Sequence, residues 1–151
     1  MNLWHYTTRS VMPKILEVGA LLPKSYQGED QATPTLWFSS NDRYEHTALK
    51  RIGIATENKV ELMSRRLTFE EQDEVLGHVR IKATDDLKTL SFLLWVRAVG
   101  KHPGWAASLA AGGAELGAHW SQWYASFDPL PCERWAAVEI YDLKTQEWRS
   151  V

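Results

Sequence analysis

The chain has 151 residues, of which 44% are hydrophobic and 24% charged, and this balance is that of one folded domain rather than of a disordered or fibrous protein. Its formal net charge of −2, with basic residues spread along the chain, disfavours non-specific binding to nucleic-acid phosphates. The single cysteine excludes an internal disulfide, and neither a signal peptide nor an apolar run of roughly 18 residues is found. We therefore expect a cytoplasmic protein without a membrane partner.

Short strands alternate with helices in the first half of the chain. Aromatic, apolar and β-branched runs predict strands at residues 3–7, 20–22 and 36–39. An apolar stripe that ends at Gly19 predicts a helix between the first two strands. Residues 24–34 lack periodicity and are expected to form a loop. Asp42, with Glu45 three residues later, resembles a capping box and predicts a helix to about Arg51.

The second half is expected to contain helices followed by strands. Thr68 and Glu71 form a capping-box pattern, and Gly77 is a stop signal, which together predict a short helix. Residues 79–83 alternate apolar and charged side chains, as a half-buried strand does. The Leu- and Ala-rich stretch 87–117 is interrupted by glycines and is expected to form two helices. Later runs predict strands at residues 123–127 and 135–141, with a hairpin return at Trp148.

Strands at both ends of the chain, with helices between them, indicate an α+β fold that forms a single domain over residues 1–151. In such a fold, pairing between distant strands brings the two ends of the chain together. We therefore expect His5 to share a cleft with acidic residues near the C-terminus.

Two segments concentrate side chains that suit ligand binding. His5-Tyr6-Thr7 belongs to the first strand, and Trp37-Phe38-Ser39-Ser40 to the third. Adjacent strand residues point to opposite faces, so at least one of Trp37 and Phe38 is structural, and we expect Phe38 to point into the core. A lone histidine in a strand is usually a hydrogen-bonding core residue, whereas the second segment favours a functional role for His5.

The order of these segments resembles that in the ADP-ribosyltransferase superfamily, in particular the branch with poly(ADP-ribose) polymerases and diphtheria-type toxins. In that branch a strand carries His-Gly-Thr, and a later Tyr-Phe-Ala segment runs into a helix. Here Tyr6 stands at the glycine position and Trp37 at the tyrosine position. The resemblance covers roughly the first third of the chain. It implies split antiparallel sheets, with inserted helices, around a cleft for NAD+.

The resemblance also implies residues for binding NAD+. This set is His5, Tyr6, Thr7, Arg9, Trp37, Phe38, Ser39 and Tyr44. His5 would bond the ribose hydroxyls of the adenosine half, and Thr7 would help to hold the nicotinamide half. Trp37 or Tyr44 would stack on the nicotinamide ring, and Arg9 would meet the pyrophosphate as a bidentate donor.

Members of the family keep a catalytic glutamate on a late strand, where it holds the ribose 2′-hydroxyl and stabilises positive charge. The late candidates here are Asp128, Glu133 and Glu139. Glu133 is preferred because it precedes a hydrophobic strand, as the family's glutamate does. Glu139 would reach the cleft only in the right register, since a slip of one residue reverses its face.

Other residues have ordinary interpretations. Five basic residues are expected on solvated faces: Arg43, Lys50, Arg51, Arg65 and Arg66. Arg80 is left open between a structural and a binding role. The five histidines lack the paired spacing of zinc ligands, so no metal is expected. Cys132 has no sequence signature that links it to a histidine base.

The resemblance implies a mono-ADP-ribosyltransferase, a glycosyltransferase that cleaves NAD+ and transfers ADP-ribose to a protein or nucleic acid. Its expected role is that of a toxin or host-modifying factor, and a toxin would need a neutralising antitoxin. One alternative is an RNA 2′-phosphotransferase-like enzyme, which the acidic balance disfavours. The other is a binding module without turnover, built around the eight tryptophans.

Overall fold

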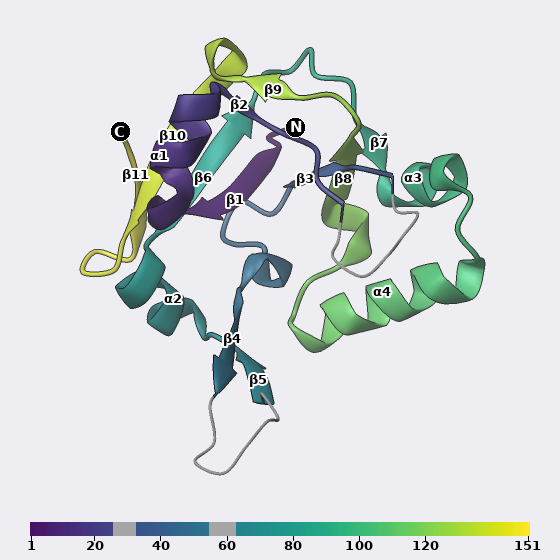
Figure 1. Ribbon diagram of the computed structural model, residues 1–151, viewed down its shortest axis with the longest axis horizontal. Helices are drawn as coiled ribbons and strands as arrows, with labels where there is room; N and C mark the ends of the chain where they lie inside the picture. Colours follow the sequence, from purple (N-terminus) through teal and green to yellow (C-terminus); the bar gives the residue numbers. More distant parts are fainter. Residues whose placement is uncertain (26–32, 55–62) are drawn as a thin grey trace.

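The computed structural model describes residues 1–25, 33–54 and 63–151. These residues form a seven-stranded sheet with the order β11-β10-β6-β1-β3-β8-β7, in which all neighbours are antiparallel (Figure 1). The first strand of the chain is therefore separated by one strand from β10 near the C-terminus. The predicted α+β class is confirmed.

The sheet consists of β1 (Trp4–Thr8), β3 (Leu36–Ser39), β6 (His78–Ala83), β7 (Leu90–Ser91), β8 (Trp123–Ser126), β10 (Trp135–Asp142) and β11 (Glu147–Ser150). Two small antiparallel pairs add β2 (Ala20–Leu21) with β9 (Leu130–Pro131), and β4 (Arg51–Ile54) with β5 (Met63–Arg66). The helices are α1 (Met12–Val18), α2 (Phe69–Leu76), α3 (Phe92–Val99) and α4 (Pro103–Glu115). Short 3-10 turns are η1 (Arg9–Val11), η2 (His46–Ala48), η3 (Trp120–Gln122) and η4 (Cys132–Arg134).

Local signals set the ends of several helices. In α2 the Thr68 hydroxyl accepts from the Glu71 N–H at 3.2 Å, and the Glu71 carboxylate accepts from the Thr68 N–H at 3.0 Å, so the predicted capping box is confirmed. The same helix ends at Gly77, whose φ of +69° favours glycine. A Cβ at Gly77 would also lie 2.9 Å from Cβ of Arg9. The two predicted helices of residues 87–117 are confirmed as α3 and α4.

Side chains alternate between two faces of the sheet. We call the face that carries His5, Phe38 and Ile81 the first face, and the face that carries Tyr6 and Arg80 the second face. The first face packs on α1 and on the β2–β9 pair in a core of seven buried residues: Leu21, Leu36, Phe38, Val79, Ile81, Ala83 and Leu130. Phe38 points into this core, as predicted.

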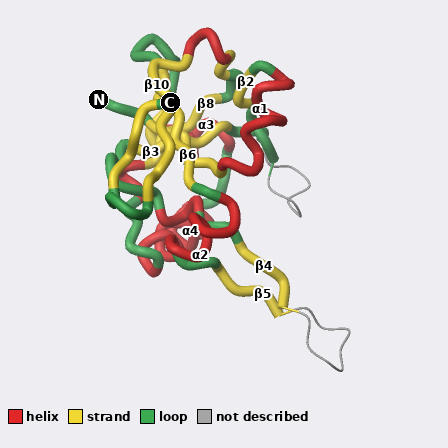
Figure 2. Tube along the Cα trace, turned by 90° about the vertical axis from the view of Figure 1, so that its left-hand side faces the viewer, coloured by secondary structure: helices red, strands yellow, loops and turns green. Residues whose placement is uncertain are grey.

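The second face carries two aromatic clusters rather than one continuous core. Near β8, α3 contributes Phe92 and Trp95 to a cluster that includes Trp123. Toward β10 and β11, Trp4 and Tyr6 pack with residues of the segment after β3. Figure 2 shows the β4–β5 pair projecting away from the rest.

The junction between β1 and β3 is short. These strands share a single paired position, Trp4 with Ser39, whereas β1 and β6 are paired along all of β1. Before β3, Thr35 forms two backbone hydrogen bonds with Lys24 instead, at 3.1 and 3.0 Å. The two halves of the sheet are thus held together at one end of this junction.

The helix predicted from Asp42 to Arg51 is wrong, because only η2 forms there. The Glu45 backbone is extended, with φ −95° and ψ 102°, and its buried carboxylate accepts hydrogen bonds from the Ser39 hydroxyl and from the Thr47 N–H and hydroxyl. This tertiary contact with β3 competes with the local capping pattern.

Residues 79–83 form a strand as predicted, but not a half-exposed one, since Arg80 is only 8% exposed. The predicted loop 24–34 is described only at its ends, and residues 26–32 lie outside the described residues. Along the described part of the chain, no helix is both long and apolar enough to cross a membrane.

Candidate functional site

His5 occupies the junction between β1 and β3. Its Nδ1 lies 2.9 Å from the Trp37 carbonyl oxygen, and its ring contacts Phe38 edge-on, with centroids 6.0 Å apart. A carbonyl can only accept, so Nδ1 carries the hydrogen and Nε2 remains an acceptor. No described residue hydrogen-bonds to Nε2, and this atom is not among the fully buried atoms that lack a partner. Nε2 is therefore an acceptor that the described part of the chain leaves unused.

The surroundings keep His5 uncharged at neutral pH. Burial lowers the pKa of His5 to about 4, against the hydrogen bond to the Trp37 carbonyl, and the positive charges of Lys50 and Lys24 lower it further. A neutral imidazole with a fixed tautomer can accept a hydrogen bond from a ligand hydroxyl.

Thr7 shares the first face with His5, since the two residues are two positions apart along the strand. Its Cα lies about 7 Å from that of His5 by strand geometry. Thr7 is buried, yet its hydroxyl makes no hydrogen bond with any described residue and is not among the fully buried orphan atoms. His5 Nε2 and the Thr7 hydroxyl, neither of which bonds to a described residue, thus lie on the same side of β1.

The two lysines whose charges act on His5 belong to different segments. Lys24 is placed by its backbone pairing with Thr35. Lys50 follows η2, where its N–H donates to Gln72 Oε1 at 2.7 Å and its carbonyl accepts from the Leu67 N–H at 2.8 Å. Burial and the charge of Lys24 lower the pKa of Lys50. Lys50 was predicted on a solvated face, and its side chain is exposed in the structure.

The structure divides the predicted NAD+-binding residues between the two faces. His5, Thr7 and Phe38 lie on the first face, whereas Tyr6 and Ser39 lie on the second.

Tyr44 is buried on the second face between Tyr6 and Phe69, with ring centroids 5.1 and 4.8 Å away. Trp37 also lies on the second face, where its ring packs against Trp95 of α3 at 4.6 Å and against Phe92. Only the carbonyl of Trp37 reaches His5, so neither aromatic ring lies beside it for stacking.

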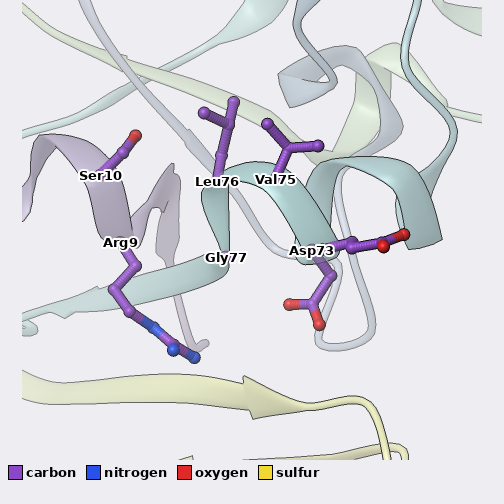
Figure 3. Close-up of a pocket in the computed structure, with 7 residues that line it drawn as sticks. Arg9, Ser10, Asp73, Val75, Leu76 and Gly77 are labelled. Carbon is purple, nitrogen blue, oxygen red and sulfur yellow. The ribbon is translucent and has the colours of Figure 1, made fainter.

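Arg9 follows the end of β1 and lines a different place. It borders a shallow pocket of about 280 Å³ at the C-terminal end of α2, together with Asp73 and Gly77. Figure 3 shows its guanidinium pointing away from Val75 and Leu76. A second hollow of about 560 Å³ extends from Arg9 to the β10–β11 hairpin, and His5 lines neither.

The three candidate acids also occupy different places. Glu139 lies on the second face, because its register partner is Arg80, which in turn pairs with Tyr6. Asp128 and Glu133 are exposed and belong to the segment around β9, which packs through Leu130 on the first face. None of the three hydrogen-bonds to His5.

Arg80 is the centre of an extensive network on the second face. It forms an ion pair with Glu139, with nitrogen–oxygen distances of 2.5 and 2.6 Å, and donates to the Asp42 carbonyl. Its guanidinium lies between the rings of Trp4 and Trp148, at 3.9 and 4.6 Å from their centroids. The sequence left the role of Arg80 open, because nothing in the local pattern indicates Glu139 as its partner.

The same network holds the segment after β3. Three consecutive carbonyls, those of residues 41, 42 and 43, accept from the side chains of Tyr6, Arg80 and Trp148. The Trp4 indole N–H donates to the Asp42 carboxylate at 3.0 Å. Burial raises the pKa of Tyr6 to about 12, so it donates as a neutral phenol. These contacts explain why the segment runs from β3 to η2 in one conformation.

Among the described residues, no group of three or more histidine, cysteine, aspartate or glutamate side chains could hold a metal ion. Comparison of the chain with protein-family models, with curated proteins and with solved structures finds no match in any of the three.

Proposed function

We propose that the protein is a mono-ADP-ribosyltransferase that binds NAD+ on the first face, beside β1. The observation that carries this proposal is the state of His5, which is neutral, fixed in one tautomer by the Trp37 carbonyl, and left with an acceptor at Nε2 that no described residue uses. Such an acceptor suits a ribose hydroxyl, and the neighbouring Thr7 hydroxyl suits a second polar group of the dinucleotide. The split β1–β3 junction supports the resemblance drawn from the sequence.

The proposed chemistry is cleavage of the bond between nicotinamide and ribose. This reaction passes through an oxocarbenium-like state, so positioning and a nearby carboxylate supply most of the rate enhancement. The proposal assigns the carboxylate to Asp128 or Glu133, since both belong to the segment that packs on the first face. Glu139 is not assigned this role because it is bound by Arg80 on the other face.

The experiment is calorimetric titration with NAD+ of the wild type and of His5→Ala. His46→Ala is the matched control, since His46 contacts Tyr44 on the second face. We expect saturable binding to the wild type and the control, and at least tenfold weaker binding to His5→Ala, since the hydrogen bonds to the ribose are lost. Failure of the wild type to bind at millimolar NAD+ would exclude the proposal.

Nicotinamide release then separates turnover from binding. We expect Asp128→Asn or Glu133→Gln to abolish release without weakening NAD+ binding, whereas Glu139→Gln retains release in the fraction that folds. The second candidate is a binding module without turnover, which is favoured by the exposure of Asp128 and Glu133 and by their lack of contact with His5. Binding without release in the wild type would establish this alternative.

A further inference from the structure

His78, the first residue of β6, ties that strand to α2. Its ring is fully buried, and its Nε2–H donates to the Phe69 carbonyl in the first turn of α2 at 2.7 Å. Its backbone N–H donates to the Asp73 carboxylate of the same helix at 3.1 Å. The Phe69 ring stacks on the imidazole at 4.1 Å, with 12° between the two ring planes. One residue thus binds α2 through its backbone, one ring nitrogen and its ring face.

The other ring nitrogen of His78 is buried and unused. Nδ1 forms no hydrogen bond with any described residue. Because Nε2 already carries the hydrogen that the Phe69 carbonyl accepts, a further proton has to bind Nδ1. Protonation therefore places a positive charge and an N–H without an acceptor inside the protein, and both are costly there. Displacement of α2, which covers the ring with Phe69, lets water solvate this group.

The neighbours of His78 on the other elements are uncharged. Tyr44, from the segment after β3, and Tyr141, from β10, present ring edges to the imidazole, with centroids 4.9 and 6.3 Å away. Burial raises the pKa of both phenols, so they stay neutral. Thr8 is the strand partner of His78 on β1 and carries no charge. None of these side chains compensates a positive charge on the imidazole.

The charged groups near His78 act in both directions. Glu70 and Asp73 of α2 attract a positive charge, but burial outweighs them and lowers the pKa of His78 below its ordinary value of 6.5. Arg80, two positions along β6 on the same face, is paired with Glu139. The arrangement in which α2 covers His78 is therefore most stable above pH 6.5, and it loses stability as the pH falls below this value.

Helix α2 is the element that can detach. Of its eight residues Gln72 alone is buried, and Val75 is 70% exposed. Gln72 Oε1 accepts from the Lys50 N–H at 2.7 Å. A helix that buries so little apolar surface depends on these polar bonds and on the Phe69–His78 stack for its position. Elements of this kind open locally at a lower free energy than the strands of the core.

We propose that His78 is a pH-sensitive switch for the position of α2. The neutral ring holds the helix on the sheet, and binding of a proton from the solvent to Nδ1 releases the helix. Release also breaks the bond between Gln72 and Lys50, which loosens the connection that leads from β3 to β4. The inference does not rest on the proposed function, because His78 lies on the second face and His5 on the first.

Amide hydrogen exchange followed by NMR at pH 7.5 and 5.5 tests the switch, with each rate corrected for the intrinsic effect of pH. The reporters are the amides of α2 and the amide of Lys50, which donates to Gln72. We expect their protection to fall about tenfold between these pH values, because the open form binds one proton with a pKa near 6.5. In His78→Gln, which keeps an N–H donor and does not titrate, this fall should be absent.

His5→Asn is the matched control, because it removes the other histidine whose pKa is lowered by burial. In this variant α2 should lose protection on acidification as it does in the wild type. Protection of α2 that is equal at both pH values in the wild type would overturn the switch. A fall in His78→Gln as large as in the wild type, or a fall that disappears in His5→Asn, would overturn it as well.

A second measurement uses the wild type alone and therefore does not depend on the folding of His78→Gln. Nitrogen chemical shifts of the imidazole report which ring nitrogen carries the hydrogen. We expect a hydrogen on Nε2 and none on Nδ1 at pH 7.5, and a pKa of His78 below 6.5. A hydrogen on Nδ1 at neutral pH, or a pKa of 6.5 or above, would show that His78 does not act as this switch.

Discussion

At the scale of single residues, His5 shows how burial selects one protonation state. The ring is taken partly out of water, its Nδ1 is committed to the Trp37 carbonyl, and no described carboxylate stabilises the charged form. His78 is in a similar state: it is fully buried, its Nε2–H donates to the Phe69 carbonyl at 2.7 Å, and its pKa is lowered mainly by burial. Both histidines are therefore folded into the protein as neutral rings.

This predicts a fall in stability on mild acidification. The folded-state pKa of His5, about 4, lies below the ordinary value of 6.5, so the unfolded chain binds more protons between these values. The free energy of unfolding is then highest above pH 6.5 and decreases as the pH falls toward 4, by up to about 1.4 kcal/mol per pH unit for His5. Urea unfolding at a series of pH values measures this slope.

His5→Asn is the informative variant, because it keeps a donor for the Trp37 carbonyl and does not titrate in this range. Its unfolding free energy is expected to depend less on pH than that of the wild type. An unchanged slope between pH 6.5 and 4 would show that His5 is not held neutral.

At the scale of elements, helix α4 contains adjacent glycines in different surroundings. A Cβ on Gly112 would meet nothing within 4 Å, whereas a Cβ on Gly113 would lie 2.5 Å from the ring of Trp123. The helix approaches the second-face cluster this closely only because Gly113 has no side chain. Gly112 makes no such contact. Glycine at this position destabilises the helix, because its backbone loses more conformational entropy on folding than that of any other residue.

We therefore expect opposite effects of the same substitution at neighbouring positions. Gly112→Ala should raise the free energy of unfolding by about 0.5 to 1 kcal/mol, since alanine favours helix and the position is open. Gly113→Ala should lower it by about 1 to 3 kcal/mol, because the Trp123 ring must move. Chemical denaturation of both variants measures the difference. Equal effects would contradict the close approach of α4 to Trp123.

At the scale of the whole molecule, the Arg80 network joins elements from both ends of the chain. Arg80 on β6 contacts Glu139 on β10, Trp4 on β1 and Trp148 on β11, and it also binds the segment after β3. Three strands and one connection thus depend on a single buried guanidinium. This network fixes which side chains of β1 and β11 point to the second face of the sheet.

Removal of one member of the ion pair should be more costly than removal of both. Arg80→Met leaves Glu139 as a partly buried charge without its partner, and we expect a loss of about 3 to 5 kcal/mol in unfolding free energy. Addition of Glu139→Leu should recover part of this loss. A double-mutant cycle by urea denaturation measures the coupling. Additive single effects would show that the pair contributes no coupling energy.

The local elements of the chain could be predicted well from short-range signals. The capping box at Thr68, the positive-φ stop at Gly77 and the alternation in 79–83 depend on neighbours within a few residues, so the sequence alone indicates α2 and β6. The helix predicted after Asp42 is wrong because that prediction also depended on short-range signals alone. The hydrogen bond between Glu45 and Ser39 of β3 competes with the local capping pattern, and local patterns do not encode this contact.

The sequence by itself determined the α+β class, most strands and helices, and the choice of His5 and Phe38 as notable residues. Only the tertiary structure decided which face each of them occupies, because strand register is set by pairing between distant segments. For this reason Glu139 and Tyr6 lie on the face opposite His5, whereas Thr7 and Phe38 share its face. Charges that are far apart in the chain become neighbours through packing, and local sequence patterns do not record their separation in space.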